Sequence, residues 1–248
     1  MNDRVVSREP ELAGQTVIVI GGSSGIGLET AKRARFEGAD VILVGRNPER
    51  LEQAAHEVGA LSSAAFDVTD FERLGKFFAE LPTPIDHVMV TSGRPYYAPL
   101  QEIDFVEARR NVEEEFWLPL QIARCVVGKV RPGGTLLFIG GTGGRRPAAG
   151  ALIVALSAAI QALTKGLAVE LAPIRVNLIA PGFVDTPLSA SILGEQLGAR
   201  REKLRNTLPI RRVVGPADIA ALAVHLMTNT AITEATYDID GGQQLVET

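Results

Sequence analysis

A glycine-rich segment near the N-terminus has the residue types and spacing of a phosphate-binding turn. The β-branched run Thr16–Gly21 leads into it, and its glycines are separated first by three residues and then by one. Glycine permits positive φ angles and close approach of the backbone to a ligand, and the start of a helix favours an anionic diphosphate. A plain tight turn is the alternative, but the order of strand, turn and helix favours a dinucleotide. We expect its contacts to come from Gly21, Ser23, Ser24, Gly25, Ile26 and Gly27.

The end of the next β-branched run, Val41–Val44, decides which dinucleotide is favoured. An acidic residue there would accept a hydrogen bond from the ribose 2′-hydroxyl of NAD(H), but the run ends in Gly45 and Arg46. An arginine supplies a cation for the 2′-phosphate of NADP(H). We therefore predict NADP(H), and the alternative is that Arg46 is an ordinary exposed side chain before a helix.

The elements that must position these residues alternate along almost the whole chain. Short β-branched runs are separated by longer stretches with helical periodicity. Strict alternation implies right-handed crossovers, and hence a doubly wound α/β fold in which helices cover both faces of a parallel sheet of about seven strands. The longest irregular segment, Pro181 to Leu193, is expected to be a lid over the substrate. The expected strands are Thr16–Gly21, Val41–Val44, Ser63–Phe66, His87–Val90, Thr135–Ile139, Arg175–Ile179 and Tyr237–Ile239, with helices beginning near Gly25, Pro48, Asp70, Phe105, Ala149 and Pro216.

Length and composition indicate one globular domain over residues 1–248, in which residues 1–13 form a flexible extension. The net charge of −4 argues against nucleic acid or an anionic membrane as the partner, and favours a small molecule.

The N-terminus has no apolar run typical of a signal or anchor, so we expect a cytoplasmic protein. The uncharged stretch Pro147–Thr164 is expected to be a buried helix and not a membrane span. One cysteine and three scattered histidines predict no metal site.

Three further segments carry a family resemblance. They are Asp67-Val68, the run Pro181–Thr186 after the sixth strand, and Asp240-Gly241-Gly242 near the C-terminus. With the glycine-rich turn, they make the chain resemble the short-chain dehydrogenase/reductase family over nearly its full length. The resemblance implies a single Rossmann-like domain that oxidises or reduces a small carbonyl or alcohol substrate. It also implies a cofactor site in which Asp67 and Val68 hold the adenine, Ser92 and Gly93 line the cofactor, and Pro181, Gly182, Val184 and Thr186 hold the nicotinamide carboxamide.

The residues that do the family's chemistry are absent from their expected positions. The family uses a tyrosine as general acid or base, a lysine four residues later that binds the ribose, a serine at the end of the fifth strand, and an asparagine. Here those positions hold Ile153, Ser157, Gly140-Gly141 and Glu115. Isoleucine cannot donate a proton, and serine has no ammonium charge to stabilise a tyrosinate. We expect cofactor binding to be retained, while proton transfer is rebuilt or abandoned.

Replacement groups for proton transfer are expected in the loops beyond the strand ends. Tyr96 and Tyr97 follow the fourth strand, and Arg94 beside them could lower a phenol pKa or hold an acidic substrate. The alternative is that both rings only cover the cleft. Thr142, next to the two glycines at the end of the fifth strand, is a further candidate.

Two charged segments hold the remaining residues that could act as a base or bind an anion. Within Glu113–Glu115, which is typical of a charged helix face, only Glu115 is considered as a base. Gly143-Gly144-Arg145-Arg146 is expected to be a flexible basic loop that is either solvated or bound to a carboxylate or phosphate.

Three functions are compatible with these residues. The first is an NADP(H)-dependent oxidoreductase of the short-chain type with a non-standard catalytic site. The second is a catalytically inactive sensor of NADP(H) or of a metabolite, and the third is a non-redox lyase or cyclase on the same scaffold. The helices around Phe105–Lys129 and Ala149–Leu171 resemble those that pair in the family, which predicts a homodimer or homotetramer. We also expect that turnover by the family's mechanism needs Ile153→Tyr, Ser157→Lys and Gly141→Ser together.

Overall fold

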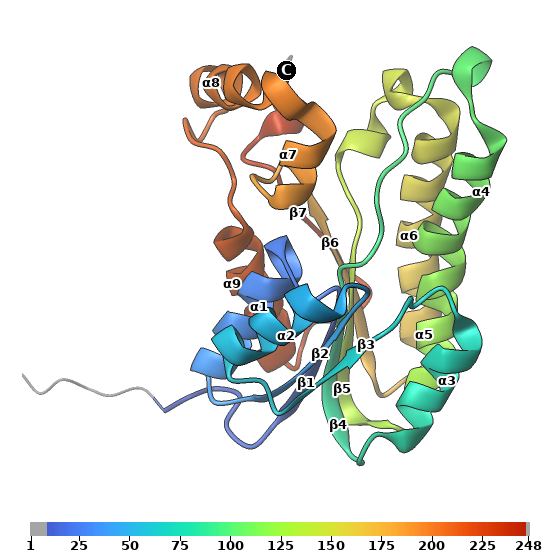
Figure 1. The fold of residues 1–248 in the computed structure, drawn as a ribbon, viewed down its shortest axis with the longest axis vertical. Helices are drawn as coiled ribbons and strands as arrows, with labels where there is room; N and C mark the ends of the chain where they lie inside the picture. The colour runs from blue at the N-terminus through green and yellow to red at the C-terminus, as the bar shows by residue number, and fades with distance from the viewer. Residues whose placement is uncertain (1–8, 247–248) are drawn as a thin grey trace, which may run out of the picture.

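A sheet of seven parallel strands lies at the centre of residues 9–246, which are the residues that the computed structural model describes (Figure 1). The strand order is β3-β2-β1-β4-β5-β6-β7, so the chain builds one half of the sheet and then crosses over to build the other. The doubly wound fold predicted from the sequence is confirmed. The strands are β1 Thr16–Ile20, β2 Asp40–Gly45, β3 Ser62–Ala65, β4 Ile85–Val90, β5 Val130–Ile139, β6 Arg175–Pro181 and β7 Thr236–Ile239.

Helices cover both faces of the sheet, as Figure 1 shows with α1, α2 and α9 on one side and α3, α5 and α6 on the other. Strand β1 shows how the sequence produces two cores, because successive side chains point to opposite faces. Val17 and Val19 pack in one hydrophobic cluster, and Ile18 and Ile20 pack in the other. The helices are α1 Gly25–Phe36, α2 Pro48–Val58, α3 Phe71–Glu80, α4 Phe105–Val112, α5 Leu118–Val126, α6 Ala151–Glu170, α7 Pro187–Leu193, α8 Leu197–Thr207 and α9 Pro216–Thr228, with a π-helical turn η2 Glu113–Trp117 and a 3₁₀ turn η3 Gly143–Arg145.

The carboxyl ends of the central strands are tied together by hydrogen bonds. Thr91, directly after β4, donates its N–H and its hydroxyl to the Ile20 carbonyl oxygen at 2.8 and 3.0 Å. The Thr142 N–H beyond β5 donates to the Pro181 carbonyl oxygen at the end of β6, at 2.8 Å. The loops after β1, β4, β5 and β6 therefore meet at one edge of the sheet, where ligands bind in folds of this type.

The expected irregular lid, Pro181 to Leu193, becomes helical at Pro187. Thr186 caps α7, because its hydroxyl accepts the Ser189 N–H at 3.2 Å while the Ser189 hydroxyl accepts the Thr186 N–H at 2.9 Å. Proline suits the first position of a helix, where its missing N–H leaves no bond unmade. Helices α7 and α8 therefore stand over this edge of the sheet as regular structure (Figure 1).

The expected flexible extension, residues 1–13, lies partly outside the described residues. Within them, Leu12 is fully buried, and its N–H donates to the Glu37 carbonyl oxygen at 2.9 Å. Leu12 therefore packs against the end of α1 as part of the domain, whereas residues 1–8 lie outside the described residues.

Helix α6 is buried along one face only. Among residues 9–246 it is the one helix that is long and apolar enough to cross a membrane, with a mean hydropathy of 1.8. Its buried side chains recur every three or four residues, which is the pattern of a helix packed on a sheet. They are Ile153, Leu156, Ile160, Thr164 and Leu167.

Candidate functional site

The turn between β1 and α1 is a backbone cradle that has no room for side chains. Gly21 has a φ of 87°, and a Cβ there would lie 2.5 Å from Thr91 Oγ1. A Cβ on Gly27 would lie 2.3 Å from the Gly21 carbonyl oxygen. Ser24 begins α1 with extended backbone and without a capping bond from its side chain, which leaves N–H groups of the first turn for a ligand. This geometry fits the diphosphate of a dinucleotide.

The cradle opens into a cleft of about 460 Å³. Twelve of the residues predicted to bind the cofactor line it: Gly21, Ser23, Ser24, Gly25, Ile26, Gly27, Arg46, Asp67, Val68, Ser92, Gly93 and Thr186. Sequence reasoning missed Asn47, Arg50, Phe66, Thr69, Thr91, Glu114, Leu118, Pro187, Leu188 and Ser191. Arg50 could have been found, because it lies in the first turn of the helix that begins just after Arg46.

The remaining three predicted residues stand beside the C-terminal segment and do not line this cleft. The Pro181 carbonyl oxygen is bonded to Thr142, and Val184 forms an isolated β-bridge with Val214. A Cβ on Gly182 would lie 2.6 Å from the Cβ of Asp240. The segment 181–184 therefore packs between β5 and the residues after β7.

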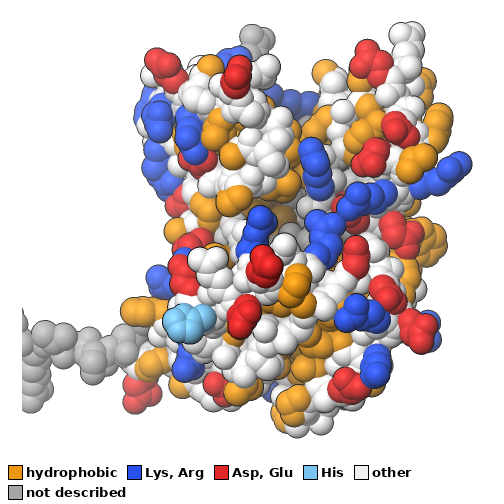
Figure 2. All heavy atoms as spheres, in the orientation of Figure 1, with side chains coloured by type: hydrophobic (Ala, Val, Ile, Leu, Met, Phe, Trp, Pro, Cys, Tyr) orange, Lys and Arg blue, Asp and Glu red, His pale blue; other side chains and the backbone are white. Residues whose placement is uncertain are grey.

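The end of the cleft near β2 carries charges of both signs. Asp67 Oδ1 accepts the N–H and the hydroxyl of Thr69 at 3.0 and 2.8 Å. Burial opposes the charge of Asp67, but these bonds and the charges of Arg46 and Arg110 hold its pKa below the ordinary value. Figure 2 shows Lys and Arg side chains on both sides of the hollow in the middle of the molecule. Arg46 and Arg50 therefore stand beside Asp67 at this end of the cleft.

The residues at the positions of the family's tyrosine and lysine pack against neighbouring parts of the chain. Ile153 is buried, and Ser157 lies against the turn η3, where a Cβ on Gly144 would lie 1.8 Å from Ser157 Oγ. Backbone therefore occupies the space into which a lysine at position 157 would extend. The need for Ile153→Tyr, Ser157→Lys and Gly141→Ser together stays a prediction, and the contact of Ser157 with Gly144 adds that the lysine has to displace this turn.

The segment 143–146 is not the flexible basic loop expected from its sequence. Arg145 makes a bidentate ion pair with Asp238 on β7, with nitrogen to oxygen distances of 2.5 and 2.6 Å. Arg146 donates to the Gln243 carbonyl oxygen. The carboxylate that this loop was expected to bind is therefore Asp238 of the same chain, and the ion pair holds the turn across Ser157.

The two tyrosines considered as proton donors have different surroundings. The Tyr96 hydroxyl accepts the Asp104 N–H at 2.9 Å and supports the start of α4. Tyr97 is 53% exposed, and its hydroxyl lies 3.0 Å from the place of a Cβ on Gly143. Burial of the rest of the side chain, and then the charge of Glu115, raise the pKa of Tyr97. Its phenol is therefore neutral at neutral pH.

Arg94 and Thr142 contribute backbone groups to this region. The Arg94 N–H donates to Glu114 at 3.2 Å, and the Arg94 carbonyl oxygen accepts from Asn111 at 2.7 Å. Arg94 does not lower the pKa of Tyr97, contrary to the expectation from the sequence, because burial and Glu115 dominate. The Thr142 side chain is buried beneath the turn it opens.

The turn η2 sends the three consecutive glutamates in different directions, so they do not form one charged helix face. Glu113 lines a separate cavity. Glu114 accepts from Arg110 Nε at 3.2 Å and lines the cofactor cleft. A π-helical turn inserts an extra residue into the helix, and such turns are frequent at functional sites.

Glu115 turns inward from η2 toward the loop after β4. Its Oε1 lies 2.9 Å from the place of a Cβ on Gly93, which itself lines the cleft. Burial, and then the charge of Glu114, raise the pKa of Glu115 to about 7. The sequence placed Glu115 at the family's asparagine position, but its surroundings depend on contacts that the sequence does not reveal.

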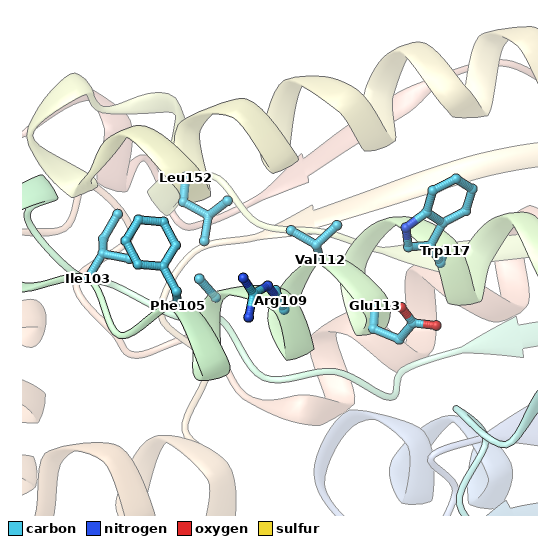
Figure 3. Close-up of a pocket in the computed structure, with 8 residues that line it drawn as sticks. Ile103, Phe105, Arg109, Val112, Glu113, Trp117 and Leu152 are labelled. Carbon is cyan, nitrogen blue, oxygen red and sulfur yellow. The ribbon is translucent and has the colours of Figure 1, made fainter.

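A second cavity of about 430 Å³ lies between α4 and the start of α6 (Figure 3). Figure 3 shows Ile103, Phe105 and Leu152 close together at one end, and Trp117 at the other. None of the predicted cofactor or catalytic residues lines it. Within residues 9–246, no cluster of three or more His, Cys, Asp or Glu side chains is placed to hold a metal ion.

Comparisons with known proteins agree with this geometry. A family model described as Enoyl-(Acyl carrier protein) reductase matches residues 20–244. Short-chain dehydrogenase/reductase ATR9 of Stachybotrys chlorohalonatus is 31% identical over 94% of this chain and 98% of its own length. The solved structure of MalC Reductase/Diels-Alderase from Malbranchea aurantiaca aligns with a TM-score of 0.87 and 25% identity, over 96% of this chain and 99% of that one. BdcA in complex with NADPH aligns with a TM-score of 0.83 and 26% identity, over 94% and 95% of the two chains. The chain belongs to the short-chain dehydrogenase/reductase family.

Proposed function

We propose that this protein is an NADP(H)-dependent oxidoreductase that reduces a small carbonyl substrate with Tyr97 as the proton donor. The observation that carries the proposal is the cleft, which joins a glycine cradle for a diphosphate to Arg46, directly after β2, and to Arg50 in the first turn of α2. BdcA, a neighbour with 26% identity, is described in complex with NADPH, which supports the choice of dinucleotide.

Tyr97 suits the reducing direction. The bound cofactor supplies a hydride to the carbonyl carbon of the substrate. A neutral phenol donates a hydrogen bond to the carbonyl oxygen and releases its proton as negative charge develops there. The reverse oxidation would need a phenolate, which the burial of Tyr97 and the charge of Glu115 oppose. Because Tyr97 is half exposed, water can return the proton after each cycle.

The test follows consumption of NADPH with a panel of carbonyl compounds, using Tyr97→Phe and, as a matched control, Tyr96→Phe. We expect Tyr97→Phe to reduce kcat by about 10²- to 10⁴-fold while NADPH binding is unchanged. Tyr96→Phe loses only the bond to Asp104 and should retain turnover. Full activity of Tyr97→Phe would exclude Tyr97 as the donor, and a wild type that binds NADPH without consuming it would exclude reduction.

A second function is favoured by the filled position at Ser157. MalC is described as a Reductase/Diels-Alderase, so one neighbour is named for cycloaddition as well as reduction. A chain without room for the family's lysine could hold NADPH and convert a substrate without redox chemistry. Product formation with no net loss of NADPH would distinguish this function from the first.

A further inference from the structure

Glu115 is an inward-facing carboxylate for which the described residues offer no hydrogen-bond donor within bonding distance. Its neighbour Glu114 differs, because it accepts from the Arg94 N–H and from Arg110. A carboxylate only accepts hydrogen bonds, and enclosing one without donors is costly. The free protein meets this cost by holding the proton of Glu115 up to a pKa of about 7.

Ser92, in the loop after β4 that Glu115 faces, provides a second polar group without a partner. Its Oγ is buried and makes no hydrogen bond among the described residues, although Ser92 lines the cofactor cleft. The next residue, Gly93, is the point that Glu115 contacts: its φ is 130°, and a Cβ there would lie 2.9 Å from Glu115 Oε1. Ser92 and Gly93 line the cleft, and because Gly93 has no side chain, Glu115 lies directly against this wall without itself lining the cleft.

The chemistry of this pair selects the ligand group. A phosphate or carboxylate would be repelled by Glu115, which has Glu114 next to it, and a carbonyl oxygen cannot donate to it. Neighbouring hydroxyls of a sugar can donate to the carboxylate and also exchange a bond with the serine, and acidic residues bind ribose hydroxyls in other dinucleotide sites. An ammonium group would satisfy Glu115, but the cleft is continuous with a cradle built for a nucleotide, whose ligand carries hydroxyls.

We propose that Glu115 and Ser92 together bind a vicinal diol, which is either the ribose on the nicotinamide side of the dinucleotide or part of a hydroxylated substrate. This inference rests on the proposed function only in taking the cleft as a dinucleotide site. Glu115 on η2 and Ser92 in the loop after β4 would take the ribose-binding role for which position 157 of α6 offers no cation, because it holds a serine packed against Gly144.

The test compares ligands that contain or lack the second ribose. Binding of NADPH and of adenosine 2′,5′-bisphosphate is measured by calorimetry for the wild type, Glu115→Gln and Ser92→Ala. Glu113→Gln, at the first residue of the same acidic run but facing the second cavity, is the matched control. A third titration adds sorbitol to the protein saturated with NADP⁺.

If the ribose is the diol, Glu115→Gln weakens NADPH binding about tenfold or more and Ser92→Ala weakens it severalfold, while the bisphosphate and the control are unchanged. If the substrate supplies the diol, the same variants weaken only sorbitol binding. Thermal unfolding at pH 8 provides a second readout: Glu115→Gln should raise the melting temperature of the free protein and reduce the shift caused by NADPH.

Unchanged binding of both NADPH and sorbitol in Glu115→Gln would overturn the diol site, as would an equal loss of bisphosphate binding. A wild type that binds NADPH but reduces no carbonyl would instead overturn the proposed function and leave the diol site standing. A wild type that binds neither NADPH nor sorbitol would overturn both.

Discussion

Arg46 follows Gly45 directly and is the residue from which the sequence predicts NADP(H). It lines the cleft at the end of β2, where Gly45 offers no carboxylate to a ribose 2′-hydroxyl. A charged hydrogen bond to a 2′-phosphate contributes about 1.5–3 kcal/mol. We expect Arg46→Ala to weaken NADPH binding by about 10- to 100-fold and to leave NADH binding unchanged. Calorimetry that finds equal affinity of the wild type for both dinucleotides would contradict this prediction.

His87 on β4 makes the stability of the protein depend on pH. His87 is buried, and its Nδ1 and Nε2 are hydrogen-bonded to Thr135 and Gln15, each at 2.8 Å. Burial lowers the pKa of His87 to about 3. Asp86 opposes this shift, and the charges of Arg175 and Arg131 add to it. The folded protein therefore keeps His87 neutral, whereas the unfolded chain binds a proton below its ordinary pKa of about 6.5.

Because the unfolded state gains this proton first, stability due to His87 is present above pH 6.5 and is lost as the pH falls toward 3. The slope approaches about 1.4 kcal/mol per pH unit. Denaturant unfolding at pH 7 and pH 5 should show the loss in the wild type and in His225→Gln, and a smaller loss in His87→Gln. An equal loss in all three proteins would show that other groups cause it.

At the scale of elements, the turn η3 decides what position 157 can hold. Gly144 lies on Ser157, and the Arg145–Asp238 ion pair fixes the turn to β7. A lysine at position 157 has to displace this backbone, and overpacking of this kind costs about 1–3 kcal/mol. We expect Ser157→Lys to lower the free energy of unfolding by this amount, and Ser157→Ala to be tolerated. A lysine variant as stable as the wild type would show that the turn yields.

Local patterns were enough to predict the elements, because alternating β-branched and amphipathic segments leave few ways to build a sheet with both faces covered. The cradle at Gly21 and Gly27 was predicted for the same reason. The capped start of α7 had a signal in Thr186-Pro187, which was missed in the sequence. The contact of Gly144 with Ser157 had none, since it depends on an ion pair between residues that are 93 positions apart. Glu115 shows the same limit, because its burial depends on the loop after β4.

At the scale of the whole molecule, the face formed by α4, η2 and α6 exposes apolar side chains. Phe105 is 65% exposed, Trp117 45% and Val169 79%. Phe105 and Trp117 also line the second cavity with Leu152 from α6, which makes the surface concave as well as apolar (Figure 3). Exposed apolar surface of this kind marks interaction sites, and a patch that meets its own copy through a twofold axis forms a closed dimer.

We therefore predict a homodimer or homotetramer that uses this face. Light scattering at micromolar concentration should give two or four times the chain mass of 26.4 kDa. Phe105→Asp places a charge in the apolar interface and should produce monomers, because an unpaired charge is costly to bury. Phe36→Asp is the matched control, since Phe36 on α1 is 77% exposed at a different place in the fold, and it should keep the wild-type mass. A monomeric wild type would contradict the prediction, and dissociation by Phe36→Asp alone would move the interface to α1.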